Sequence, residues 1–121
     1  MEFIPHSDIA SLSNPGVVSR QLLSPANSTS ERVTITEVHL DAHASQPRHR
    51  HDSSEQIWYL LKGKGTLLLA DERELPIATG DVARFEDGDV HGLRNDGNAE
   101  LIYLSVTAPP IDFGYAYRST S

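Results

Sequence analysis

The feature that most constrains the fold of this chain is a series of short β-type segments separated by turn residues. Residues 33–40 are rich in β-branched side chains and partly alternate, and residues 56–61 form a short apolar run that ends at a glycine-rich turn. Similar segments follow at 65–70, 75–78, 82–85 and 101–106. No stretch longer than about ten residues keeps a helical period without Gly or Pro. The pattern predicts an all-β antiparallel sandwich or barrel with few or no helices.

The length of 121 residues suits one domain. Residues 1–31 are rich in Ser, Asn and Pro, so we expect loops with one or two strands and no independent core. Residues 32–108 hold the β-type segments and form the predicted domain. Residues 109–121 begin at a Pro-Pro pair and carry Phe113, Tyr115 and Tyr117, which we expect to pack back onto the domain or onto a neighbouring molecule.

Composition excludes several classes of function. Ten basic against seventeen acidic residues give a net charge of −7, which disfavours nucleic-acid binding. The absence of Cys excludes disulfides, zinc–thiolate sites and thiol nucleophiles. The N-terminus lacks a basic region followed by an apolar run, and the apolar stretches are too short to cross a bilayer. We therefore expect a soluble, cytoplasmic protein without a membrane partner.

Three histidines and one glutamine suggest a metal site. His49 and His51 are separated by one residue, so in a strand their side chains would share one face. His91 lies forty residues further on, and Gln56 opens an apolar segment. On its own, a His-x-His pair is more often the polar face of a strand than a metal site. Three imidazole nitrogens and an amide oxygen would nevertheless suit a divalent Fe, Mn, Ni, Cu, Co or Zn ion.

The wider spacing of these residues strengthens the metal interpretation. The chain carries two spaced motifs, His49-x-His51-x4-Gln56-x6-Gly63 and Gly80-x5-Glu86-x-Gly88-x2-His91-x3-Asn95. This arrangement resembles the two motifs of the cupin superfamily and covers residues 43–95. The resemblance implies a single-domain cupin jelly-roll β-barrel of two facing antiparallel sheets. It also implies one divalent transition metal (Fe, Mn, Ni or Zn) held by His49, His51, Gln56 and His91.

Three positions depart from the cupin pattern. His43 stands in place of a glycine, Glu86 in place of a proline, and Gln56 in place of the expected glutamate ligand. The spacing to Gly63 selects Gln56, whereas its neighbour Glu55 would need a β-bulge to face the ion. A neutral amide leaves the site near a charge of +2, so we expect it to bind anionic ligands and to retain its metal less tightly.

The resemblance also suggests which residues form a substrate pocket. Trp58 and Leu60 stand at even offsets from Gln56 and should face inward with it, and Leu93 follows His91 by two residues. Ordinary core packing explains Trp58 equally well.

Arg84 has two possible orientations. It would clamp a substrate carboxylate if it faces the cavity. It is a surface charge if Ala83 and Phe85 face inward, and we favour this second interpretation.

Two classes of function are compatible with the sequence. Small cupins resemble dioxygenases, isomerases and lyases that act on hydroxy or keto acids or sugar-like molecules at a metal. The alternative is a non-catalytic cupin that binds or senses a small anionic molecule. Small cupins also commonly pair, so we expect a homodimer that exchanges the N-terminal arm, with residues 17–23 as the exchanged segment.

Overall fold

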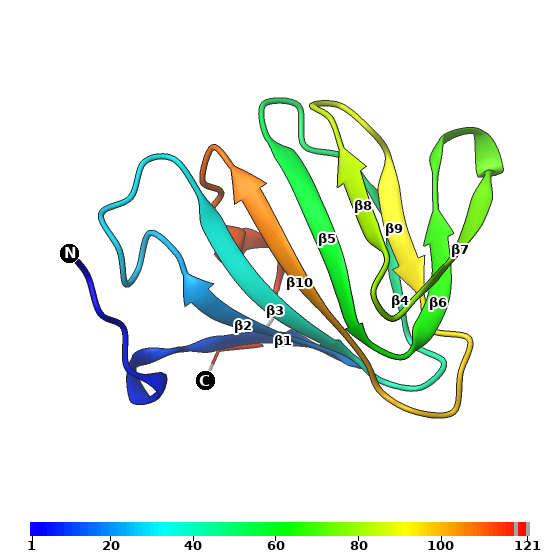
Figure 1. Cartoon of the computed structure of the whole chain (residues 1–121), viewed down its shortest axis with the longest axis horizontal. Helices are drawn as coiled ribbons and strands as arrows, with labels where there is room; N and C mark the ends of the chain where they lie inside the picture. The colour runs from blue at the N-terminus through cyan, green and yellow to red at the C-terminus, as the bar shows by residue number, and fades with distance from the viewer. Residues whose placement is uncertain (118, 121) are drawn as a thin grey trace.

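The computed structural model describes residues 1–117 and 119–120, and β-strands dominate it (Figure 1). The strands in this part of the chain are β1 (Ser11–Asn14), β2 (Val17–Leu23), β3 (Thr34–Leu40), β4 (Ser45–His49), β5 (Glu55–Lys62), β6 (Lys64–Leu68), β7 (Glu74–Ala78), β8 (Val82–Phe85), β9 (His91–Arg94), β10 (Leu101–Ala108) and β11 (Ser119–Thr120). Three short 3₁₀ helices accompany them: η1 (His6–Asp8), η2 (Ala70–Glu72) and η3 (Phe113–Ala116). Within the described residues, no helix is long and apolar enough to cross a membrane.

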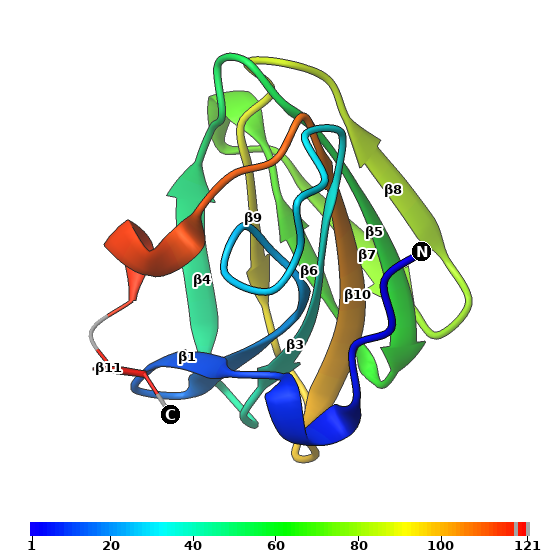
Figure 2. The same cartoon turned by 90° about the vertical axis from the view of Figure 1, so that its left-hand side faces the viewer.

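The strands form two antiparallel sheets that face each other. The larger sheet has the order β11-β1-β2-β3-β10-β5-β8, and the smaller one has the order β4-β9-β6-β7. Figure 2 shows β4, β9 and β6 on one side of the molecule and β10, β5 and β8 on the other. The all-β, two-sheet architecture predicted from the sequence is confirmed.

The core lies between the sheets because side chains alternate along the strands. On β5, Gln56, Trp58 and Leu60 are buried, whereas Tyr59 between them is exposed. The alternation expected around Gln56 is therefore present. The apolar core consists of Val17, Val38, Leu40, Trp58, Leu60, Leu67, Ile77, Phe85, Leu93, Leu101 and Tyr103.

Three strands and one boundary differ from the sequence-based prediction, and one of these strands is β11 in the tail. The segment expected at 65–70 ends at Leu68, because η2 follows with Asp71 and Glu72 in the left-handed region at φ of 59° and 60°. Strands β4 and β9 were not expected. The sequence of β4, Ser-Gln-Pro-Arg-His, has no β-branched or apolar alternation, and cross-strand pairing with β9 determines its structure instead.

The N-terminal arm contributes a hairpin to the larger sheet. Strand β2 pairs with β3 of the same chain, placing Val17 opposite Leu40, and β1 pairs with both β2 and β11. An exchange of residues 17–23 between two copies would remake the same pairing with a partner. This exchange stays a prediction.

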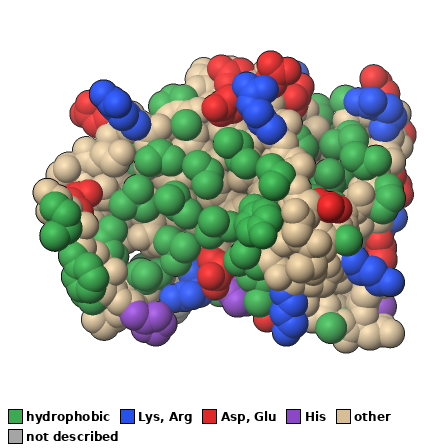
Figure 3. All heavy atoms as spheres, viewed as in Figure 1, with side chains coloured by type: hydrophobic (Ala, Val, Ile, Leu, Met, Phe, Trp, Pro, Cys, Tyr) green, Lys and Arg blue, Asp and Glu red, His purple; other side chains and the backbone are tan. Residues whose placement is uncertain are grey.

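The outer face of the larger sheet is apolar at its centre, and Figure 3 shows the hydrophobic side chains gathered there. The outward residues of β10 are Ile102, Leu104 and Val106, all partly exposed, and Tyr59 and Leu61 of β5 are 43% and 41% exposed. Contiguous apolar surface of this kind marks an interaction surface more often than scattered single residues do.

Candidate metal centre

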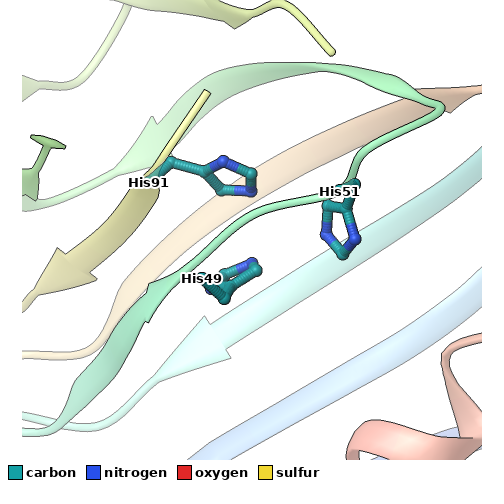
Figure 4. A group of neighbouring side chains, drawn as sticks. All are labelled: His49, His51 and His91. Carbon is teal, nitrogen blue, oxygen red and sulfur yellow. The ribbon is translucent and has the colours of Figure 1, made fainter. Parts of the chain in front are cut away.

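Three histidines from two strands and one loop converge on one point. His49 ends β4, His51 lies in the loop that follows, and His91 begins β9 directly opposite His49. The ring centroids of His49 lie 5.1 Å from His51 and 4.3 Å from His91, and those of His51 and His91 are 5.4 Å apart. One nitrogen of each ring lies within 4.8 Å of the other two. Figure 4 shows the three imidazoles approaching one another.

Local backbone features bring the histidines together. His51 lies beyond the end of β4, so the shared strand face expected from the spacing is not what aligns it with His49. Its backbone oxygen accepts a hydrogen bond from the Gly88 nitrogen at 2.8 Å, which ties its loop to the turn before His91. A Cβ at Gly92 would lie 2.8 Å from the backbone oxygen of Gln46, so glycine permits the close approach of β4 and β9.

Backbone carbonyls determine which ring nitrogens can bind a metal. His49 Nδ1 lies 2.9 Å from the Pro47 oxygen, and His91 Nδ1 lies 2.8 Å from the Asp89 oxygen. Since a carbonyl only accepts, both Nδ1 atoms must donate a proton, which leaves the Nε2 lone pairs free. Two of the three buried side-chain atoms without a hydrogen-bond partner in the described residues are the Nε2 atoms of His51 and His91; the third is Thr34 Oγ1.

Burial keeps two of the histidines in the neutral form that a metal requires. Burial and, to a smaller extent, the nearby His49 together lower the pKa of His91 to about 4. Burial also lowers the pKa of His51. Phe85 stacks on His91 at 4.6 Å between centroids and holds this ring in place. At neutral pH, His51 and His91 are therefore uncharged, and in His91 the single ring proton stays on Nδ1, which leaves Nε2 open to a metal.

Gln56, rather than Glu55, lies on the cavity side of β5. Gln56 is 4% exposed; its Nε2 donates to Thr107 Oγ1 at 3.0 Å, and its Oε1 accepts from Trp58 Nε1 at 3.2 Å. The carbonyl oxygen keeps a second lone pair. Glu55 lies on the other face, where it accepts a 2.7 Å hydrogen bond from Arg84. The role of Gln56 as a metal ligand stays a prediction.

His49 and His51 line a cavity of about 640 Å³ between the sheets. It extends from β5 across β10 and β3 to β2, and η3 covers part of it. The described residues that line it include no Asp or Glu. The buried Nε2 atoms lack a hydrogen-bond partner, which is costly for a polar atom. A divalent transition metal bound to the neutral imidazoles would supply that partner.

Of the four predicted pocket residues, one lines the cavity and three do not. Trp58 lines the cavity. Leu60 and Leu93 belong to the packed core and do not line it, because their side chains fill the space between the sheets. Arg84 is also absent from the cavity: it is exposed on β8 and paired with Glu55, while Phe85 is buried, as in the surface interpretation.

Sequence reasoning missed several residues that line the cavity. Tyr103 and Ser105 face it from β10, and Thr36 faces it from β3. The alternation of residues 101–108 was the available signal, but without the pairing of β10 with β3 and β5 their orientation was unknown. The aromatic residues of the tail, Phe113 and Tyr117, do pack back onto the domain and form part of the cavity wall.

Comparison with known proteins places these observations in a family. The Cupin domain family matches residues 36–107. An uncharacterized protein of Methanocaldococcus jannaschii is 27% identical over 109 residues, covering 90% of this chain and 83% of the relative. An oxalate-binding protein of Thermotoga maritima is 34% identical over 58 residues, covering 48% of this chain and 47% of the relative.

A solved structure agrees with the family match. The structure of KdgF from Halomonas sp. superposes with a TM-score of 0.78 at 17% identity, covering 93% of this chain and 96% of that chain. At this identity the similarity shows the fold. The family match extends over more than half of the chain and includes His49, His51 and His91. The chain belongs to the cupin superfamily.

Proposed function

We propose that this cupin binds a divalent transition metal through His49, His51 and His91, with Gln56 completing the ligand set. In the adjoining cavity it holds and acts on a small oxygenated anion of the hydroxy-acid, keto-acid or sugar-like type. The observation that carries the proposal is the pair of buried, unpartnered Nε2 atoms on His51 and His91, which lie close to His49. A bound ion would satisfy all three nitrogens at once.

The charge of the cavity favours an anionic ligand. When bound, the ion would supply positive charge that polarises a ligand oxygen. The described lining residues include no carboxylate to neutralise this charge, and Arg50 at the rim is balanced by its ion pair with Asp52 at 3.3 Å. The oxalate-binding protein of Thermotoga maritima is named for a ligand with two carboxylates, and such an anion would suit the positive charge of a bound metal. This relative therefore supports the same class of ligand here.

The residues around the site favour positioning over proton abstraction. Tyr103 donates a hydrogen bond to Gln46, and burial raises its pKa well above the usual value, so its hydroxyl stays protonated. Tyr103 would therefore not act as a base, and because its one proton is donated to Gln46, its oxygen can only accept a hydrogen bond from a ligand. A dioxygenase, isomerase or lyase reaction would have to depend mainly on the metal.

A non-catalytic binding protein is the second candidate. It is favoured by the lack of Asp or Glu among the described lining residues, because a carboxylate is a common general base. Such a protein would hold the same anion without converting it.

Titration of oxalate into metal-loaded and metal-free protein tests the proposed function. Isothermal titration calorimetry should show binding of one oxalate per chain to the loaded protein and at least about tenfold weaker binding to the metal-free protein. Equal affinity in the two forms would contradict the proposal. To separate enzyme from binder, NMR would follow loaded protein incubated with glycolate, pyruvate and oxalate under air: a new product supports the enzyme, and unchanged ligands support the binder.

We also propose that the chain forms a homodimer. In addition to the exchange of residues 17–23, the apolar outer face around Leu104 and Tyr59 offers a contact surface for a second copy. Light scattering coupled to gel filtration should give twice the chain mass of 13.3 kDa. A monomer mass at every concentration would contradict the prediction.

A further inference from the structure

The cavity is much larger than a minimal dicarboxylate requires. Its volume of about 640 Å³ falls within the roughly 300–1,000 Å³ typical of pockets that enclose drug-sized molecules. Oxalate, two carboxylates joined directly, would leave most of this space to water. The cavity size therefore points to a larger ligand than that of the oxalate-binding relative.

The cavity spans four strands of the larger sheet. Its lining includes Gln56 on β5, Ser105 on β10, Thr36 on β3 and Ser19 on β2. Three strand spacings separate β5 from β2, which corresponds to about 14 Å. Since the rings of His91 and Trp58 of β5 lie 5.4 Å apart between centroids, a ligand bound at the histidines has room to extend in the direction of β2.

Aromatic side chains line much of this space. Trp58 and Tyr103 pack together on the sheet with ring centroids 4.6 Å apart. Phe113, Tyr115 and Tyr117 of the tail also line the cavity. Several aromatic rings around one cavity favour a planar, apolar body packed against them, because ring pairs gain stability beyond simple area burial.

The aromatic cover begins directly beside the proposed metal ligands. The ring of Phe113 lies edge-on to His51, with centroids 5.9 Å apart. Ala116 accepts a hydrogen bond from Asn14 Nδ2 at 2.9 Å, and the backbone oxygen of Pro109 accepts one from Ser54 Oγ at 2.9 Å. These contacts attach the tail to the domain on both sides of Phe113, so its ring is a built part of the cavity wall.

We propose that the ligand is an elongated planar anion whose oxygen-donor head lies at the three histidines and whose ring system packs against the aromatic cavity lining, with Phe113 beside the head. The proposal rests on the proposed function, because the histidine centre receives the head. The hydroxyls of Ser105 and Thr36 in the cavity lining would hydrogen-bond to polar substituents of the ring system. The aromatic lining selects the ring system, whereas the metal end selects the head.

Three probes with graded size test the proposal on zinc-loaded protein: oxalate, salicylate and 3-hydroxy-2-naphthoate. Salicylate and 3-hydroxy-2-naphthoate share the same hydroxy-acid head and differ by one ring. Calorimetry should show about tenfold tighter binding of the naphthoate, because its second ring buries additional apolar surface. Equal affinity for the two would overturn the proposal.

Substitution of Phe113 tests the contribution of the aromatic lining to binding separately from that of the metal site. Phe113→Ala should weaken naphthoate binding by roughly three- to tenfold and leave oxalate binding within about twofold. Phe113→Tyr retains the ring and should restore naphthoate binding, and Phe3→Ala, at an exposed phenylalanine outside the cavity lining, is the matched control. An equal loss for oxalate and naphthoate in Phe113→Ala would overturn the assigned role of Phe113.

The same experiment distinguishes this inference from the proposed function. If the wild type binds no zinc, or binds oxalate equally with and without zinc, the metal-dependent function fails. If zinc-dependent oxalate binding is present but the naphthoate gains nothing over salicylate, only the assignment of a planar ring system fails. Unfolding midpoints of the Phe113 variants within a few degrees of the wild type would show that altered binding is not caused by unfolding.

Discussion

Replacing His91 with alanine should reduce the affinity for a divalent metal by more than about 100-fold. In metal sites generally, substituting a residue that only hydrogen-bonds to a ligand already lowers metal affinity about 10- to 100-fold. Loss of one of the three imidazoles should therefore lower the affinity at least as much. His91 is 2% exposed, and its Nε2 has no other partner. At about 100 times the wild-type Kd, the metal should raise the free energy of unfolding of the wild type by about 2.7 kcal/mol and that of the variant by much less.

Two further variants make the His91 result specific. His6→Ala removes an exposed histidine outside the cluster and should keep wild-type affinity. His91→Leu keeps most of the side-chain volume and offers no ligand atom, so it tests whether loss of metal in His91→Ala reflects a collapsed cavity. Metal affinity measured by competition with a colorimetric chelator decides the outcome. Unchanged affinity in His91→Ala would contradict the assigned ligand set.

Replacing Gln56 with glutamate should have opposite effects on the metal-bound and metal-free protein. A carboxylate beside the three histidines should tighten metal binding by about tenfold or more, because it neutralises part of the ion's charge. Without metal, the carboxylate is buried at a position that is 4% exposed, and we expect a loss of about 1–3 kcal/mol in the free energy of unfolding at pH 7.

The pH dependence of Gln56→Glu follows from the same burial. Burial raises the pKa of the introduced carboxyl above its value in the unfolded chain, so the loss of stability should shrink as the pH falls from 7 towards 4. Urea unfolding at several pH values checks this. Glu55→Gln, on the opposite face of β5, is the matched control and should leave metal affinity unchanged. Equal metal affinity of Gln56→Glu and wild type would show that residue 56 does not contact the ion.

The period-two pattern of the sequence was sufficient to predict four strands of the larger sheet. β3, β5, β8 and β10 appear within two residues of the expected segments, because their apolar or β-branched residues alternate. β4 was missed because a strand paired at the edge of the smaller sheet needs no apolar alternation of its own. The orientation of Gln56 and Trp58 followed from the alternation, whereas that of Tyr103 required the register of β10.

The candidate site was predictable in its residue types but not in its walls. Motif spacing predicted His49, His51 and His91 as candidate ligands, and the structure places them together. The pocket walls depend on contacts between distant segments, such as Phe113 beside His51, which no local pattern encodes. Leu93 was misassigned because an inward side chain can fill the core instead of facing a cavity.

The central claim is that three histidines of this chain hold a metal, and elemental analysis tests it most directly. The protein would be purified without chelator or a His tag, beside the His49→Ala/His51→Ala variant. We predict iron, manganese, nickel or zinc at close to one ion per chain after purification or reconstitution, and its loss in the variant. A wild type that takes up no metal even on reconstitution, or a variant that retains it, would contradict the account.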